Sequence, residues 1–526
     1  MWWKTGVVYQ IYPRSFMDSN GDGIGDIPGI ISRLDYLQWL GIDAIWFSPL
    51  FPSPMADFGY DVMDYTDIHH EYGSLADFDK LLIEAHSRNI KIILDLVPNH
   101  TSIEHPWFQE SRSSRDNPKR DWYIWKDPKP DGSPPNNWLA YFGGPAWTFD
   151  ETTGQYYMHN FDPGQPELNW RNPEVKQAMF DVIRFWLRRG VDGFRIDVID
   201  RILKDTQFRD NPPNPDWKPG DPLVGSLLRV YSEAAPGTHD YMRQFRRVFD
   251  EFPGTVAIGE VQYGLTTQQL AAFYGDDDEL HLPFNFGLLG LPWDAAAIRA
   301  FVDDYDAGLP AFGQPNYVLG NHDSPRIASK YGMAQVGVAA VLLLTLRGTP
   351  TIYYGEELGM HNVTIPADQI LDPQGKNQAG FNRDECRTPM QWDTTPNAGF
   401  TCPDVVPWLP VASDYEQINV AVQQQNPASL LNLYRRLLAY RKRTPALNAG
   451  RYYSLDAPEG CFVYLRQFND QQRLVVLNFT TEAHTLSLDE WESGLIAIST
   501  DYHREGQTID LKNWVVRANE ALVIEV

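Results

Sequence analysis

The 526-residue sequence has few cysteines, no long apolar run and fewer basic than acidic residues, and each shortage excludes a class of protein. Its three cysteines, Cys386, Cys402 and Cys461, are odd in number and lack metal-ligand spacing. We therefore expect no disulfide framework and a reduced, cytoplasmic setting. The longest apolar run, residues 336–346, is too short to cross a bilayer, so it predicts a buried element rather than a membrane span.

Charge and the N-terminus narrow the expectations further. The 44 basic residues against 69 acidic ones leave a net charge of −25, which repels polyphosphates and acidic membrane surfaces. Neither nucleic acid nor a membrane is therefore expected as a partner. Residues 1–16 hold Lys4 and Arg14 in a strand-like run without a small-residue cleavage site, so no secretory signal is predicted.

Strand-like and helix-like segments alternate through most of the chain. Short β-branched and aromatic runs predict strands at residues 7–12, 41–47, 90–97, 191–196, 255–258, 281–286, 317–319 and 349–354. Between most of them, apolar residues recur at helical spacing. Two of these helices have capping signals, Ser74 with Asp77 at one start and Asn172-Pro173 at another. Eight such units predict an α/β fold, a closed (β/α)8 TIM barrel.

Two segments interrupt this alternation. Residues 101–170 are rich in Pro, Gly, Asn and Trp without a sustained period, which predicts an irregular domain inserted after the third strand. From residue 451 the helices stop and short strand-like runs continue to residue 526, which predicts a C-terminal antiparallel β domain. The barrel is then expected to comprise residues 1–100 and 171–450.

Carboxylates lie in or shortly after the C-terminal ends of four of the predicted strands. They are Asp95, Asp197, Glu260 and Asp323, and barrel enzymes place catalysis at these strand ends. Any one of them alone could be a helix N-cap. Four at one rim indicate acid/base chemistry, because buried carboxylates are costly unless they are paired or functional.

Two of these carboxylates suit retaining glycoside hydrolysis. Arg195 and Asp197 lie two apart on one strand, so they should face the same side, and an arginine favours the charged form of a carboxylate that acts as nucleophile. Glu260 would keep its proton for the leaving oxygen. Retaining enzymes need this pair about 5–5.5 Å apart.

Four motifs resemble the signature regions of glycoside hydrolase family 13, the α-amylase family. They are residues 95–100, Gly193-Phe194-Arg195-Ile196-Asp197, Gly259-Glu260-Val261 and Asn321-His322-Asp323. Gln165-Pro166-Glu167-Leu168-Asn169 is similar to a fifth region that separates oligo-1,6-glucosidase-like members from endo-acting amylases, with Glu in place of the usual Asp. The resemblance covers the whole chain.

The resemblance implies roles for individual residues. Asp197 would be the nucleophile, Glu260 the acid/base, and Asp323 the residue that grips the sugar hydroxyls and helps to distort the ring. Arg195, His100 and His322 would bind the same glucosyl unit. For either histidine alone, a buried core histidine would be the better interpretation.

The resemblance also implies a closed pocket. Asp57 would pair with an arginine from the loop after strand eight at the non-reducing end, and Tyr60 would stack on the glucose ring. Arg383 and Arg387 are both candidates for this partner, and for each a plain loop salt bridge is the alternative. A pocket blocked behind one glucose makes the enzyme exo-acting.

A loop after the first strand alternates oxygen-bearing residues. Asp18, Asn20, Asp22 and Asp26 supply side chains, with the backbone carbonyl of Ile24 between them, and calcium loops use this alternation. Gly29 stands where an EF-hand has its bidentate Glu. The loop resembles a structural Ca²⁺ or Mg²⁺ site of the oligo-1,6-glucosidase branch, and the alternative is an Asx-rich turn without metal. No organic cofactor is expected.

Three functions follow, and each has its own discriminating feature. The first is an α-glucosidase acting on small α-glucosides, with α-1,6 linkages favoured over α-1,4 because Val198 resembles the isomaltase-like members. The second is a transglucosylase or sucrose/trehalose isomerase, which would yield more oligosaccharide than glucose. The third, a non-catalytic sugar-binding protein, disagrees with the presence of all three carboxylates. The sequence does not determine the natural sugar or the oligomeric state.

Overall fold

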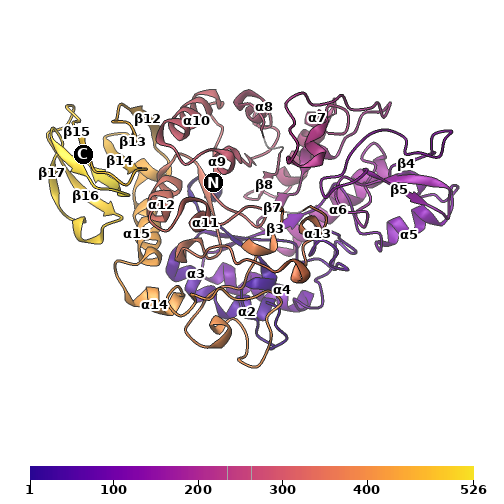
Figure 1. Ribbon diagram of the computed structural model, residues 1–526, viewed down its shortest axis with the longest axis horizontal. Helices are drawn as coiled ribbons and strands as arrows, with labels where there is room; N and C mark the ends of the chain where they lie inside the picture. The colour runs from indigo at the N-terminus through magenta and orange to yellow at the C-terminus, as the bar shows by residue number, and fades with distance from the viewer. Residues whose placement is uncertain (234, 262–263, 379) are drawn as a thin grey trace.

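An eight-stranded parallel sheet forms the centre of the computed structural model, which describes residues 1–233, 235–261, 264–378 and 380–526 (Figure 1). Its strands, in the order of the sheet, are β10 (Asn316–Val318), β11 (Thr349–Tyr353), β1 (Val8–Ile11), β2 (Ala44–Phe47), β3 (Lys91–Leu96), β7 (Gly193–Ile196), β8 (Val256–Gly259) and β9 (Leu282–Pro283). A parallel bridge between Asn285 and Tyr317 joins the two ends of this sheet. The predicted (β/α)8 barrel is confirmed.

Strand β9 is much shorter than the run of residues 281–286 that was predicted for it. His281 does not join the ladder, because its ring Nδ1 accepts the backbone N–H of Ala257 at 3.0 Å. Pro283 has no N–H to donate. The strand therefore stops after two residues, although Phe284 still donates to the carbonyl of Gly259.

Helices follow most of the strands, and their ends obey the capping signals of the sequence. The main ones are α2 (Ile27–Ser32), α3 (Leu34–Leu40), α4 (Leu75–Ser87), α6 (Pro173–Arg189), α7 (Thr238–Asp250), α8 (Thr267–Ala272), α10 (Ala295–Gly308), α12 (Val336–Thr345) and α15 (Leu430–Arg443). Ser74 and Asp77 form the predicted capping box of α4. Gly190 ends α6 in the left-handed conformation that glycine tolerates best.

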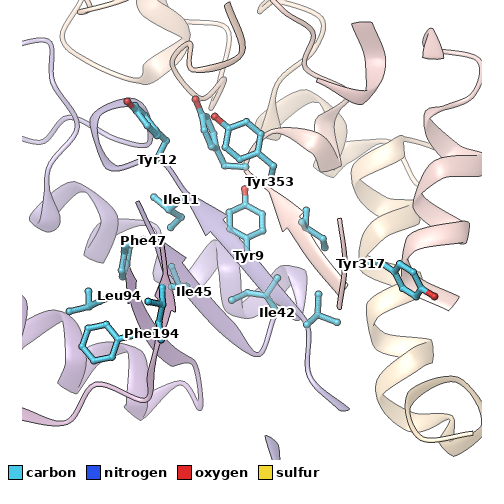
Figure 2. Close-up of a cluster of buried hydrophobic side chains, with 14 of the residues drawn as sticks. Tyr9, Ile11, Tyr12, Ile42, Ile45, Phe47, Leu94, Phe194, Tyr317 and Tyr353 are labelled. Atoms are coloured by element: carbon cyan, nitrogen blue, oxygen red, sulfur yellow. The ribbon is translucent and has the colours of Figure 1, made fainter. Parts of the chain in front are cut away.

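Side chains of the barrel strands alternate between the helices and the barrel interior. Tyr9 and Ile11 of β1 face the helices in the large core, part of which Figure 2 shows, together with Phe47, Leu94 and Phe194. A separate interior cluster contains Val8, Ala44, Trp46, Ile93, Val256, Ile258, Leu282, Phe284 and Val318. The same alternation points Asp95 and Arg195, which are register partners on β3 and β7, into the barrel.

The segment after β3 carries a small sheet of its own. Helix α5 (Pro106–Ser113) is followed by a three-stranded sheet in the order β4 (Trp125–Lys126), β6 (Gln155–Met158) and β5 (Trp147–Asp150). Trp138 and Trp147 form a buried aromatic cluster there with Ile124 and Met158. Most of its aromatic residues therefore serve as core.

The C-terminal strands form an antiparallel domain at the opposite end of the molecule from β4 and β5 (Figure 1). Six strands pair in the order β12 (Arg451–Leu455), β13 (Cys461–Phe468), β14 (Gln471–Asn478), β19 (Ala521–Glu525), β16 (Ser493–Ser499) and β17 (Thr508–Asp510), and β15 (His484–Leu486) pairs with β18 (Trp514–Val516). Helix α12 contacts β14 and β19, which explains why its apolar run is buried on all sides. No helix in the described ranges is both long and apolar enough to span a membrane.

Candidate active site

One guanidinium connects three of the four predicted carboxylates. Arg195 Nη1 donates to Asp95 at 2.9 Å and to Asp197 Oδ1 at 2.7 Å, and its Nη2 donates to Glu260 Oε2 at 2.5 Å. Asp95 and Arg195 point inward from adjacent strands, and Asp197 and Glu260 lie one residue beyond β7 and β8. The barrel ends thus bring these side chains together from positions far apart in the sequence.

The charges of this cluster do not balance. Three buried carboxyls face one cation, so full ionisation would leave two net negative charges out of water. Burial raises the pKa of the Asp197 carboxyl well above its usual range, with Arg195 opposing this and Glu260 adding to it. Burial likewise raises the pKa of Asp95 to about 6. The unliganded cluster therefore retains a proton near neutral pH.

Asp323 has the opposite electrostatic environment. Burial disfavours its charge, but His322, Arg383 and Arg387 hold the pKa of its carboxyl well below the usual range. Arg383 Nη1 and Arg387 Nη2 donate to its Oδ1 at 3.2 and 3.0 Å. Asp323 is therefore ionised and fixed in place.

His322 is a neutral ring at neutral pH. Burial lowers its pKa to about 3. With Gln10 donating to Nδ1 at 2.7 Å, the ring proton lies on Nε2, which is 2.7 Å from the Tyr60 hydroxyl and 3.2 Å from Asp323. Tyr60 donates in turn to Asp95 at 3.1 Å. His322 thus orients Tyr60 through a hydrogen bond and lies directly beside Asp323.

Of the two candidate arginines, the structure brings Arg383 to Asp57. Its Nη2 donates to Asp57 Oδ1 at 2.7 Å, and it also donates to Asp372 Oδ1 at 2.6 Å. Arg387 instead donates to Asp323 and, through Nε, to the carbonyl of His322 at 2.8 Å. Asp372 was not predicted, because nothing in a loop without periodicity marks a residue that holds an arginine.

His100 lies next to Tyr60 and Gln165. Its Nε2 is 3.1 Å from the carbonyl of Tyr60 and 3.3 Å from the amide nitrogen of Gln165, which also donates to Asp57 Oδ2 at 3.1 Å. Burial lowers the pKa of His100 to about 3, so it too is neutral. Gln165 belongs to the Gln-Pro-Glu-Leu-Asn motif but was not predicted as a site residue.

A cavity of about 540 Å³ opens onto these groups. Nine predicted residues line it: Asp57, Tyr60, His100, Asp197, Val198, Glu260, His322, Asp323 and Arg383. Arg195 and Arg387 lie behind the wall and act on it through the contacts above. Further lining residues that the sequence analysis missed are Tyr141, Phe142, Phe161, Arg201, Pro222, Ser324, Gln374 and Phe381. No tryptophan lines the cavity within the described residues.

Val198 has a strained backbone next to Asp197. Its φ of 35° and ψ of 44° lie in the left-handed region, which β-branched residues rarely adopt. The conformation turns its N–H toward Glu260 Oε2, at 3.2 Å, and the next N–H, of Ile199, donates to the Glu260 carbonyl. The strain therefore helps to fix Glu260 beside Asp197.

The loop predicted to bind a metal is folded by its own side chains. Both oxygens of Asp18 accept hydrogen bonds, from the N–H groups of residues 20, 21 and 23 and from the Thr401 hydroxyl. The side-chain oxygens of Asn20 and Asp22 accept the N–H groups of residues 22 and 24 and keep unused lone pairs. Asp26 caps α2, because its Oδ1 accepts the N–H of Gly29 at 2.6 Å. In the part of the chain that the structure describes, no group of three His, Cys, Asp or Glu side chains is arranged to hold a metal ion.

The chain is similar to several known proteins over nearly its full length. A family model described as alpha amylase, catalytic domain, matches residues 10–450. A probable alpha-glucosidase of Rhizobium meliloti (strain 1021) is 42% identical over 93% of this chain and 91% of its own. An oligo-1,6-glucosidase of Halalkalibacterium halodurans is also 42% identical, over 91% of this chain and 90% of its own.

Solved structures show the same similarity. The crystal structure of an alpha-glucosyl transfer enzyme covers 100% of this chain and 99% of that one, with a TM-score of 0.94 and 40% identity. That of a trehalulose synthase variant covers 100% of both chains, with a TM-score of 0.92 and 36% identity.

Proposed function

Because the chain belongs to the α-amylase family, glycoside hydrolase family 13, and is a glycoside hydrolase, we propose that it is an exo-acting, retaining α-glucosidase of short α-glucosides. One observation carries this proposal. Asp197, Glu260 and Asp323 lie on the wall of a single cavity whose wall also includes the ion pair of Asp57 and Arg383. This ion pair would close the cavity behind one glucosyl unit, so that the enzyme could cleave only the glycosidic bond at the non-reducing end of the substrate.

The reaction would proceed in two steps. Asp197 attacks the anomeric carbon while Glu260 gives its proton to the leaving oxygen, which forms a covalent glucosyl-enzyme. Glu260, now a carboxylate, takes a proton from water, the water attacks the same carbon, and Asp197 is released. Arg195 stabilises the carboxylate of Asp197 once the proton of the cluster lies on Glu260, and again when Asp197 leaves.

Residues around the glucosyl unit would supply the rest. Asp323, held ionised by Arg383 and Arg387, accepts hydrogen bonds from sugar hydroxyls. The neutral rings of His100 and His322 bind hydroxyls without adding positive charge near the oxocarbenium-like transition state. Tyr60 presents its ring to the sugar.

Val198 supports a preference for α-1,6 over α-1,4 linkages. It lies on the cavity wall directly after the nucleophile, where a leaving sugar would pass. An initial-rate panel on maltose, isomaltose, sucrose, trehalose and panose tests the whole proposal. We expect glucose release, with isomaltose cleaved faster than maltose; no release from any of the five would overturn it.

Transfer of glucose to acceptors other than water is the second candidate. One argument for it is the similarity to an alpha-glucosyl transfer enzyme. Another is that aromatic residues such as Tyr141, Phe142 and Phe381 on the cavity wall would bind a sugar acceptor more strongly than they bind water. Product analysis at high sugar concentration separates the two, because a transferase yields more oligosaccharide than free glucose.

We also propose a structural divalent cation, Ca²⁺ or Mg²⁺, at the loop of residues 18–26. Asn20 and Asp22 have oxygens to offer, and the carbonyl of Ile24 follows in the same loop. Asp26 could join only by releasing Ser19, whose N–H and hydroxyl donate to its carboxylate. Asp18 could join only if the Thr401 hydroxyl turned away. The cation would stabilise the loop and take no part in the reaction.

A cytoplasmic location completes the proposal. All three cysteines are free, and Cys386 and Cys461 are buried as thiols, which suits a reducing compartment. Cell fractionation tests it, and recovery of the protein outside the cytoplasm would contradict it.

A further inference from the structure

A buried ion pair joins the segment inserted after β3 to the loop that follows the nucleophile. Lys204 Nζ donates to Glu167 Oε2 at 2.5 Å, and the two residues are 4% and 0% exposed. Glu167 lies near the C-terminal end of the inserted segment, whereas Lys204 lies seven residues after Asp197. The mechanism proposed above uses neither side chain.

Every polar atom of this pair has a partner. Glu167 Oε1 accepts from Asn99 Nδ2 at 2.7 Å and from the N–H of Asn160 at 3.1 Å. Lys204 also donates to Asn99 Oδ1 at 3.0 Å and to the carbonyl of Arg201. A buried charge needs this degree of satisfaction, and removal of one partner leaves the other charge uncompensated.

The pair lies behind one part of the cavity wall. This part, which we call the seam wall, consists of Tyr141 and Phe161 from the inserted segment and Arg201 from the loop after β7. The Arg201 guanidinium lies 4.3 Å from the Tyr141 ring centroid and 5.8 Å from that of Phe161. The position of the Arg201 backbone, which Lys204 holds, therefore contributes to how the two segments meet, together with Glu233, which accepts a hydrogen bond from the Tyr141 hydroxyl at 2.6 Å.

The seam wall is one part of the cavity that remains for the leaving group, beside the lining residues Phe142, Pro222, Ser324, Gln374 and Phe381. Asp57, Tyr60, His100, His322, Asp323 and Arg383 are tied to one another around the place of the glucosyl unit. Arg201 instead follows Val198, which adjoins the nucleophile, by one turn. Whatever the glucosyl unit is attached to would meet Tyr141, Phe161 and Arg201.

We propose that Glu167 and Lys204 are positioning residues for the seam wall, and that they thereby set the binding of the leaving sugar. The proposal rests on the α-glucosidase function. It predicts that loss of the pair lowers kcat/KM most for substrates whose leaving group contacts the seam wall. The bond-breaking step itself should be unaffected.

Two substrates separate these effects. Isomaltose has a glucose as its leaving group, whereas α-glucosyl fluoride has a single atom, so only the first can contact the seam wall. In Glu167→Gln and Lys204→Met we expect kcat/KM for isomaltose to fall at least about tenfold, mainly through KM, and that for the fluoride to stay within about threefold. Glu167→Asp, one methylene shorter but still charged, should give an intermediate loss and serves if the stronger variants fold poorly.

A second buried ion pair provides the matched control. Arg504 and Glu520 lie 2.6 Å apart and buried in the C-terminal domain. Glu520→Gln should lower the melting temperature as Glu167→Gln does, without changing the ratio of the two kcat/KM values. Equal losses on both substrates, or no loss on isomaltose, would overturn the inference, whereas a wild-type protein that cleaves neither substrate would refute the α-glucosidase function instead.

Discussion

Arg383 Nη2 lies 2.7 Å from Oδ1 of Asp57, a residue 326 positions earlier in the chain. The same arginine donates to Asp372 and Asp323, so one guanidinium holds three carboxylates at one end of the cavity. The loop after β11 and the loop after β2 meet at this contact. It is the basis for an exo mode of action.

Removal of this arginine should disable the glucosyl site. In Arg383→Ala, three carboxylates lose their shared cation, and truncation of one member of a buried charge pair costs about 2–5 kcal/mol. We expect kcat/KM for p-nitrophenyl α-glucoside to fall at least about thirtyfold. Arg451→Ala, which removes an exposed arginine on β12, is the control and should leave kcat/KM unchanged. Near-normal turnover in Arg383→Ala would show that the pair does not close the site.

The two carboxylates beside Arg195 should be indispensable. Asp197→Ala removes the nucleophile, so we expect no detectable turnover of p-nitrophenyl α-glucoside. Glu260→Gln removes the transferable proton, and general acid–base catalysis is worth roughly 10²–10⁴-fold. Circular dichroism should show an intact fold in both variants, and Asp368→Asn, at an exposed carboxylate, should be fully active. Substantial activity in Asp197→Ala would rule out the proposed nucleophile.

A buried glutamate outside the cavity wall should make stability depend on pH. Glu356 accepts from the Tyr434 hydroxyl at 2.9 Å, with Glu357 and Arg326 close by, and burial raises its pKa from 4.5 to about 8. Between these two values the folded chain holds a proton that the unfolded chain has lost, so this contribution to stability falls as the pH rises. Glu356→Gln carries no such proton.

We therefore expect Glu356→Gln to match the wild type at pH 5 and to be the more stable protein at pH 9. Urea unfolding at both pH values measures this, with Glu459→Gln, at an exposed glutamate, as the control. If the variant and the wild type lose stability in parallel between pH 5 and pH 9, Glu356 does not hold the proton.

Metal removal should affect stability and not chemistry. With EDTA we expect the melting temperature to drop by a few degrees and to recover on addition of Ca²⁺ or Mg²⁺, since a ligand that binds only the folded state stabilises it. Asp22→Asn should reduce this response. A melting temperature that is the same with EDTA and with added cation would show that the loop is an Asx-rich turn without metal.

The sequence predicts the barrel well because its strands and caps are local signals. Runs such as residues 90–97 and the capping box at Ser74 depend on neighbours a few residues away. Where a distant side chain intervenes, the prediction is wrong in length: His281 accepts the N–H of Ala257 and shortens β9. The apolar residues at helical spacing between the first two predicted strands are divided between α2 and α3, which Arg33 separates.

The candidate site divides in the same way. Carboxylates after strands are predictable because parallel strand ends meet at one rim. The choice between Arg383 and Arg387 depends on how an irregular loop folds over Asp57, and no periodicity encodes that. The strained backbone of Val198 and the buried pair of Glu167 and Lys204 are also visible only in three dimensions.

The anomer of glucose that is released first distinguishes retention of the anomeric configuration from its inversion. Proton NMR of the reaction with p-nitrophenyl α-glucoside, recorded before mutarotation, distinguishes α-glucose from β-glucose. Two displacements by way of Asp197 retain the configuration, so we expect α-glucose as the first product. Initial release of β-glucose would contradict it.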